Sequence, residues 1–133
     1  MFGGNSNWRG PIWFPTNFSL LDALTKFHRY LGEDFKISVP GLRTHELCLQ
    51  EVQALLAERL INLFRRNAEG FIPAFPKNSL LQTDPYWQEY LLFHEYFHAE
   101  SGLGLGAAHQ TGWTALVAVL LKKRYTTWHE LRL

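Results

Sequence analysis

The feature that most constrains this sequence is the spacing of its apolar residues, which recur every three or four positions in three long segments. Such spacing places apolar side chains along one side of an α-helix. It predicts helices over residues 16–31, 45–67 and 111–125, with Gly32 ending the first. Glycine- and proline-rich stretches separate the three segments and break helices.

A fourth, shorter helix is expected over residues 84–90, because Asp84-Pro85 resembles an N-cap followed by proline at the first helical position. Residues 91–97 are rich in aromatic side chains, and their spacing fits an extended strand as well as a helix. Residues 102–106 contain three alternating glycines and predict a tight loop. Together these segments predict an all-α protein with Gly-, Pro- and aromatic-rich loops.

Composition excludes several classes of protein. The 133 residues suffice for about one domain, and a hydrophobic content of 47% with 19% charged residues excludes intrinsic disorder. A net charge of +1 gives no general attraction to nucleic acid or an anionic membrane. The single cysteine, Cys48, excludes a disulfide scaffold. No secretory signal is readable near the start and no apolar run is long enough to span a membrane, so we expect a cytoplasmic protein.

Aromatic residues make up 15% of the chain, and many lie in two loops that combine them with polar side chains. The first loop, residues 5–15, holds the candidate ligand-binding residues Asn7, Trp8, Arg9 and Trp13. Tryptophan faces pack on the C–H faces of sugars, while Asn and Arg hydrogen-bond to hydroxyl groups. The alternative is an ordered loop whose tryptophans cover the end of a helix bundle.

The second loop contains His94-Glu95-Tyr96-Phe97-His98, which matches the H-E-x-x-H pattern of zinc peptidases. On a helix, His94 and His98 would share one face and bind zinc, with Glu95 activating a water molecule. Against zinc, glycines follow within a few residues and leave little room for a supporting helix. Alternatively, Glu95 lies among aromatic and histidine side chains, a setting that suits a general acid or base.

Two motifs together resemble a known family. They are residues 2–15, FGGNSNWRGPIWFP, and residues 95–117, which contain EYF, GLGLGA and QTGWTALV. Both look like the C-terminal part of glycoside hydrolase family 63, which contains the processing α-glucosidase, with the mannosylglycerate hydrolases as similar enzymes. The resemblance implies a partial (α/α)6 barrel, with residues 1–133 forming a single C-terminal portion of that domain.

The resemblance also implies an inverting α-glycosidase that acts on an oligosaccharide or small glycoside without a metal or other cofactor. By position, Glu95 matches the general base. The sugar-binding residues would be Asn7, Trp8, Arg9 and Trp13, with Gln110 and Trp113 beside the base. His94 and His98 would then surround the site and bind no metal.

The chain departs from the family in two ways. The family's general-acid Asp lies upstream of the first motif, and a closed barrel needs twelve helices. We therefore expect the isolated chain to be a fragment without activity, whose uncovered apolar faces favour a homo-oligomer or the missing N-terminal barrel portion as partner. A non-catalytic oligomerisation or carbohydrate-binding module and a zinc peptidase remain as alternatives.

Overall fold

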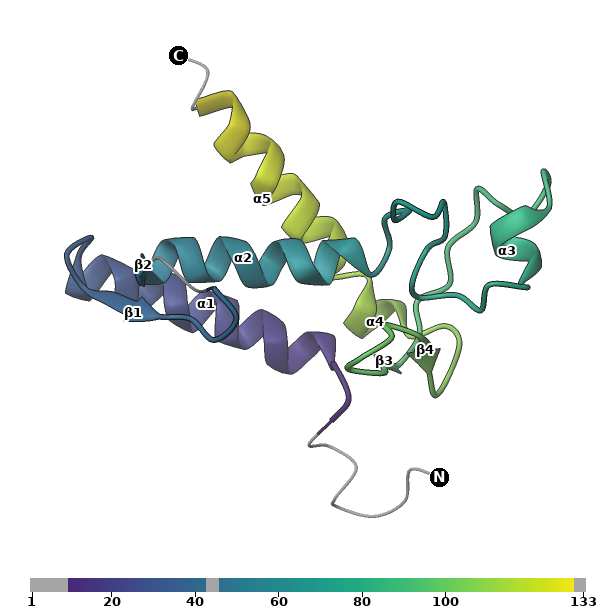
Figure 1. Ribbon diagram of the computed structural model, residues 1–133, viewed down its shortest axis with the longest axis horizontal. Helices are drawn as coiled ribbons and strands as arrows, with labels where there is room; N and C mark the ends of the chain where they lie inside the picture. Colours follow the sequence, from purple (N-terminus) through teal and green to yellow (C-terminus); the bar gives the residue numbers. More distant parts are fainter. Residues whose placement is uncertain (1–9, 43–45, 131–133) are drawn as a thin grey trace.

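Two helices lying side by side form the largest part of the structure (Figure 1). The computed structural model describes the backbone of residues 10–42 and 46–130, and side chains as far as Lys123. The first helix, α1 (Phe14–Leu31), carries a proline in its first turn, where the missing N–H would have no partner in any case. It ends as predicted at Gly32, which adopts φ 80° and donates its N–H to the carbonyl of His28 at 2.8 Å. The second helix, α2 (Leu49–Asn62), packs along α1.

Short antiparallel sheets accompany the helices. Strand β1 (Lys36–Ser38) pairs with β2 (Glu46–Cys48), and β3 (Tyr96–Phe97) pairs with β4 (Gly104–Leu105). The predicted fold class, an all-α partial (α/α)6 barrel, is therefore wrong. The described residues form a mixed structure of helices and two small sheets.

The β1–β2 pairing also explains why α2 begins later than residue 45, the predicted start. Glu46–Cys48 is extended and hydrogen-bonded to β1, so the helix can begin only at Leu49. The Glu51 carboxylate then accepts the N–H of Cys48 at 2.8 Å, as in a capping box. This hydrogen bond lowers the pKa of Glu51.

The short helix lies before Asp84, whereas the sequence predicted it after this residue. Helix α3 (Leu80–Thr83) begins at Ser79, whose hydroxyl accepts the N–H of Leu81 at 3.2 Å. Asp84 is extended and accepts the N–H of Tyr86 at 2.8 Å, so it starts a turn. The predicted helix over residues 84–90 is therefore wrong.

The last predicted helix is divided into two. Helix α4 (Thr111–Thr114) is followed by α5 (Val117–Glu130), which packs against α2 in its first turns and then extends outward (Figure 1). Over the described residues, no helix combines the length and apolarity needed to cross a bilayer.

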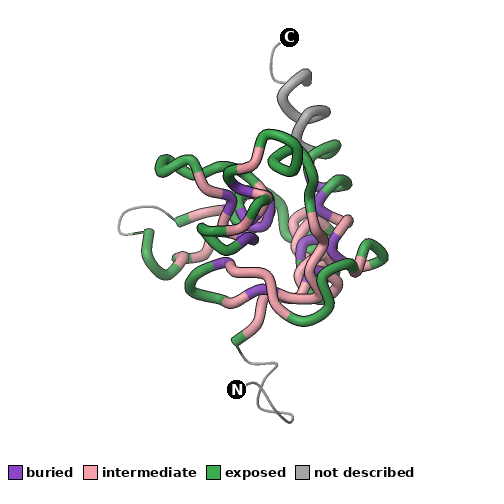
Figure 2. Tube along the Cα trace, turned by 90° about the vertical axis from the view of Figure 1, so that its right-hand side faces the viewer, coloured by how far each residue is buried: buried purple, intermediate pink, exposed green. Residues whose placement is uncertain are grey.

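The core forms where both long helices meet the segment around β3. Phe97 is completely buried at its centre, with its ring centroid 5.8 Å from that of Phe14 and 5.6 Å from that of Phe64. Buried residues occur in several segments of the chain (Figure 2). The core residues are Phe14, Leu21, Leu60, Ile61, Leu63, Ile72, Ala74, Phe75, Phe97, Val117 and Leu120.

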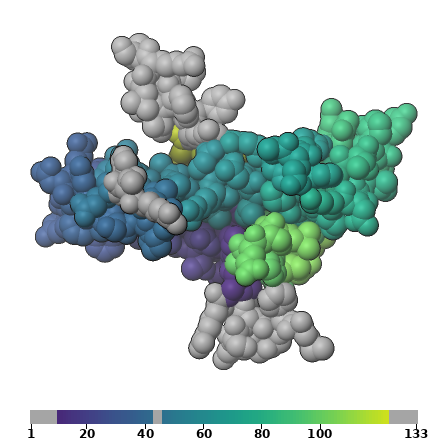
Figure 3. Space-filling model, in the orientation of Figure 1, coloured from purple at the N-terminus to yellow at the C-terminus, as the bar shows by residue number. Residues whose placement is uncertain are grey.

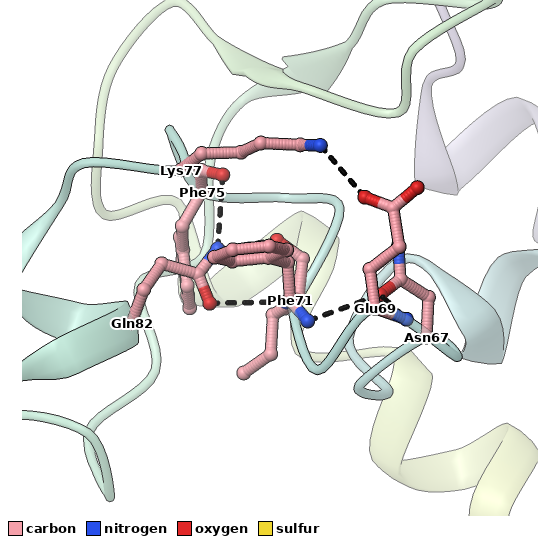
Figure 4. Close-up of polar contacts among 7 residues, drawn as sticks. Asn67, Glu69, Phe71, Phe75, Lys77 and Gln82 are labelled. Atoms are coloured by element: carbon pink, nitrogen blue, oxygen red, sulfur yellow. Dashed lines mark hydrogen bonds and ion pairs between the residues drawn. The ribbon is translucent and has the colours of Figure 1, made fainter.

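A buried glutamine holds the loop that follows α2 (Figure 4). The Gln82 amide donates to the carbonyls of Ile72 and Phe75, at 2.8 and 3.1 Å, and its oxygen accepts the N–H of Ile72 at 3.0 Å. All three bonds satisfy backbone groups that water cannot reach easily. Near the surface, Lys77 pairs with Glu69 at 2.7 Å.

Gln82→Ala should lower the free energy of unfolding by about 2 kcal/mol, because it leaves buried backbone groups without partners. Denaturant unfolding would measure the loss. Gln88→Ala is the matched control, since Gln88 is exposed, and it should change stability by less than about 0.5 kcal/mol. Equal effects of the two variants would contradict the bracing role of Gln82.

Candidate functional site

Strand β3, which follows Glu95 directly, is held along both edges. Along one edge Phe97 and Ile12 exchange two backbone hydrogen bonds, of 2.8 and 2.9 Å. Along the other, β3 pairs with β4 in the glycine-rich loop. The lime-green surface of this region lies next to the purple start of α1 (Figure 3). The structure thus joins the described end of the first motif to the second motif.

Each of the three alternating glycines leaves no room for a side chain. Gly102 has φ 75°, and a Cβ there would lie 2.9 Å from the side chain of Leu63. A Cβ at Gly104 would overlap the His94 ring and lie 2.9 Å from the carbonyl oxygen of Ala74. Gly106 has φ 72°, and a Cβ there would lie 2.6 Å from Oε2 of Glu95. The loop therefore packs against its neighbours more closely than side chains would permit.

Glu95 is half-buried and bonded to the glycine-rich loop by both its backbone and its side chain. Its N–H donates to the carbonyl of Ala107 at 2.9 Å, and its Oε2 accepts the N–H of Ala107 at 3.2 Å. The two bonds fix the side chain against one backbone position. This arrangement gives the carboxylate a defined orientation.

Helix α4 holds the residues that precede Glu95. Thr114 is completely buried, and its hydroxyl donates a short hydrogen bond to the carbonyl of His94. The N–H of Gln110, at the start of α4, donates to the carbonyl of Phe93 at 2.6 Å. The role of Thr114 has no signal in the sequence, because its partner is a backbone carbonyl.

Two of the predicted substrate-binding residues meet directly. The rings of Trp13 and Trp113 lie edge to face, with centroids 5.3 Å apart and an interplanar angle of 89°. Asn7, Trp8 and Arg9 lie outside the described residues. The described part of the first loop therefore contributes Trp13 to an aromatic contact beside α4.

The segment that matches H-E-x-x-H is extended in the structure. Tyr96 and Phe97 form β3, so residues 94–98 lack the helical turn that would put His94 and His98 on one face. His98 instead accepts the N–H of Ser101 through Nδ1, at 3.3 Å. Over the residues described, no three His, Cys, Asp or Glu side chains gather as a metal site would require. The helical geometry assumed for a zinc peptidase is absent.

His94 lies in an apolar setting between rings. Its centroid is 6.3 Å from that of Phe75 and 6.5 Å from that of Phe97. Its Nδ1 is buried and has no hydrogen-bond partner among the described residues. Burial disfavours the charged imidazolium and lowers the pKa of His94.

A small hollow of ≈ 180 Å³ opens beside the described end of the first loop. Gly10 and Pro11 line one side, and His98, Ala99 and Glu100 line the other. Glu100 is exposed and is a carboxylate that sequence reasoning did not single out. Its position near the loop makes it a useful comparison for Glu95.

Two curated proteins of Saccharomyces cerevisiae are similar to this chain. An uncharacterized protein is 51% identical over 120 residues, which cover 89% of this chain and 11% of that protein. Mannosyl-oligosaccharide glucosidase is 31% identical over 121 residues, covering 90% of this chain and 11% of the enzyme. The chain thus spans about a ninth of the length of these relatives. No family model and no solved structure matches the chain.

The similarity to the glucosidase extends through most of the chain, and it supports a distant relationship to glycoside hydrolase family 63. The relationship is to a short part of a much longer enzyme.

We predict that the chain is less stable at acid pH because His94 has a lowered pKa in the folded state. As the pH falls through about 6.5, the unfolded chain takes up a proton at this position before the folded chain does, so stability is lost. Denaturant unfolding between pH 5 and 8 would measure how the free energy of unfolding changes with pH. His94→Phe should make this change smaller.

His109→Ala is the control, since His109 is exposed. It should leave the pH dependence of unfolding close to that of the unchanged chain. If the pH dependence of the free energy of unfolding is the same in His94→Phe as in the unchanged chain, His94 is not its cause.

Proposed function

We propose that this chain carries the general base of an inverting glycosidase, and that this base is Glu95. The observation that carries the proposal is the double attachment of Glu95 to Ala107, which orients a half-buried carboxylate at the junction of the two motifs. The similarity to a glucosidase over 90% of the chain supports glycoside hydrolysis as the reaction class. An extended H-E-x-x-H segment favours this function over a zinc peptidase.

The chemistry follows from the two carboxylate oxygens. Oε2 accepts the N–H of Ala107, and Oε1 takes a proton from a water molecule. The water oxygen forms a bond to the anomeric carbon on the face opposite the leaving group. The glycosidic C–O bond breaks, and the departing oxygen receives its proton from a general acid. We assign that acid to an Asp supplied by a further part of the complete enzyme.

Substrate binding is proposed for six residues. Trp13 and Trp113 would offer ring surface to a sugar, and Gln110 would lie beside the base. Asn7, Trp8 and Arg9 would bind hydroxyl groups or stack from the first loop. The substrate class is an α-linked gluco- or manno-configured glycoside, in keeping with the name of the glucosidase relative.

Glu95→Gln should lower kcat by about 10²–10⁴-fold, because it removes the group that accepts the proton from water. The assay needs a complete enzyme, so this chain replaces the matching 121 residues of yeast mannosyl-oligosaccharide glucosidase in a chimera. Hydrolysis of α-glucosides and α-mannosides would be followed, with the anomeric configuration of the product determined by NMR.

Glu100→Gln is the matched control, since it makes the same chemical change at an exposed carboxylate five positions along the loop. Its kcat should stay within about twofold. Equal rates for Glu95→Gln and the unchanged chimera, or retention of configuration, would contradict the proposal.

A second proposed function, self-assembly, rests on the exposed apolar surface. Leu20, Phe27 and Leu31 follow one another at i, i+7 and i+11 along α1, and they are 47%, 58% and 40% exposed. A helix that buries one apolar stripe and exposes another is suited to lie between two partners. Other large exposed side chains include Tyr30, Phe35, Leu80, Tyr86, Trp87 and Tyr90.

Phe27→Glu should reduce self-association of the isolated chain, because it places a charge in the exposed stripe of α1. Sedimentation velocity would give the mass, which should be that of an oligomer for the unchanged chain and smaller for the variant. Ser19→Glu is the control, because it adds the same charge at an exposed polar position of the same helix. A monomeric unchanged chain would contradict self-assembly.

A further inference from the structure

We infer that Gly106 is a positioning residue for the Glu95 carboxylate, and that its missing side chain sets where the carboxylate lies. The inference rests on the proposed function, since it concerns the group proposed to activate water. It assigns to Gly106 a role that acts through Glu95.

The space around Gly106 is filled by Glu95 and its neighbour. A Cβ at Gly106 would lie 2.6 Å from Oε2 of Glu95, 2.9 Å from Cβ of Glu95 and 2.8 Å from Cε1 of Tyr96. Real Cβ atoms do not approach other atoms so closely, so either the carboxylate or the loop would have to move. The same movement would break the 3.2 Å hydrogen bond from Ala107 to Oε2.

Three other glycines have positive φ without any close neighbour, so they show what the backbone requirement alone looks like. Gly32, Gly41 and Gly70 have φ values of 80°, 87° and 83°, but a Cβ at each would have no atom within 4 Å. Glycine at those positions serves only the backbone turn. Gly106, at φ 72°, combines the same backbone requirement with direct contact to a proposed catalytic group.

The contact has a consequence for catalysis. Because Gly106 has no side chain, the Ala107 N–H can reach Oε2 of Glu95. This hydrogen bond fixes the orientation of the carboxylate and therefore the position of Oε1. A shift of about 1 Å in a catalytic group can cost about 10²-fold in rate. A methyl group at position 106 should therefore impair turnover more than it impairs substrate binding.

The test is a double-mutant cycle read by thermal unfolding of the full chain. Gly106→Ala should lower the Tm through backbone strain and through the clash with Glu95. Adding Glu95→Ala removes the clashing carboxylate, so it should raise the Tm of the Gly106→Ala variant. In the matched control, Gly70→Ala, the strain is similar and no clash exists, so adding Glu95→Ala should not raise the Tm.

The amide proton of Ala107 gives a second readout by NMR. Glu95→Gln should move this resonance upfield in the unchanged chain and in Gly70→Ala, because a neutral amide is a weaker acceptor than a carboxylate. In the Gly106→Ala variant, Glu95→Gln should no longer shift the Ala107 amide resonance. If Gly106→Ala alone does not fold, recovery of folding on adding Glu95→Ala still supports the inference.

Turnover in the chimera completes the test. Gly106→Ala should lower kcat by about 10²-fold and leave KM within about twofold, whereas Gly70→Ala should change neither by more than about twofold. The inference would be overturned if the Tm effects of the changes at positions 95 and 106 were additive. It would also be overturned if Glu95→Gln shifted the Ala107 amide resonance equally with and without Gly106→Ala. Either result would stand even where hydrolysis depends on Glu95. Coupling without any dependence of hydrolysis on Glu95 would overturn the proposed function instead.

Discussion

The rest of this structure depends on the pairing of Phe97 with Ile12. The two residues exchange backbone hydrogen bonds of 2.8 and 2.9 Å, while the Phe97 side chain fills the centre of the core. Helix α1 begins just after Ile12, and β4 lies on the other edge of β3. A single buried residue therefore connects the packing of the long helices to the loops that form the candidate site.

The candidate site is held together by hydrogen bonds to the backbone. Thr114 and Gln110 hold the backbone before Glu95, and Ala107 holds Glu95 itself. Rigid support of this kind is what a general base needs, since its oxygen must meet one water molecule in one direction. The distant relationship to a glucosidase is the reason for proposing this role for Glu95.

Local patterns in the sequence predicted only the features that depend on local interactions. Helix α1 and its end at Gly32 follow from apolar spacing and a glycine, both of which lie within the segment itself. The start of α2 was misplaced because Glu46–Cys48 pairs with a strand ten residues earlier. The role of Glu95, which rests on motif resemblance, stays a prediction, whereas Thr114 had no signal in the sequence, since it acts on a distant backbone carbonyl.

The pairing of Ile12 with Phe97 also bears on how the protein is made. The two residues are 85 positions apart in the sequence (12 to 97), and loop closure over such a separation is entropically costly before its contacts form. During synthesis, α1 and α2 can pack against each other long before Phe97 leaves the ribosome. Phe14 and Phe64 lack their contacts with the Phe97 ring during that interval, so the newly made chain exposes these aromatic side chains to chaperones or to other chains.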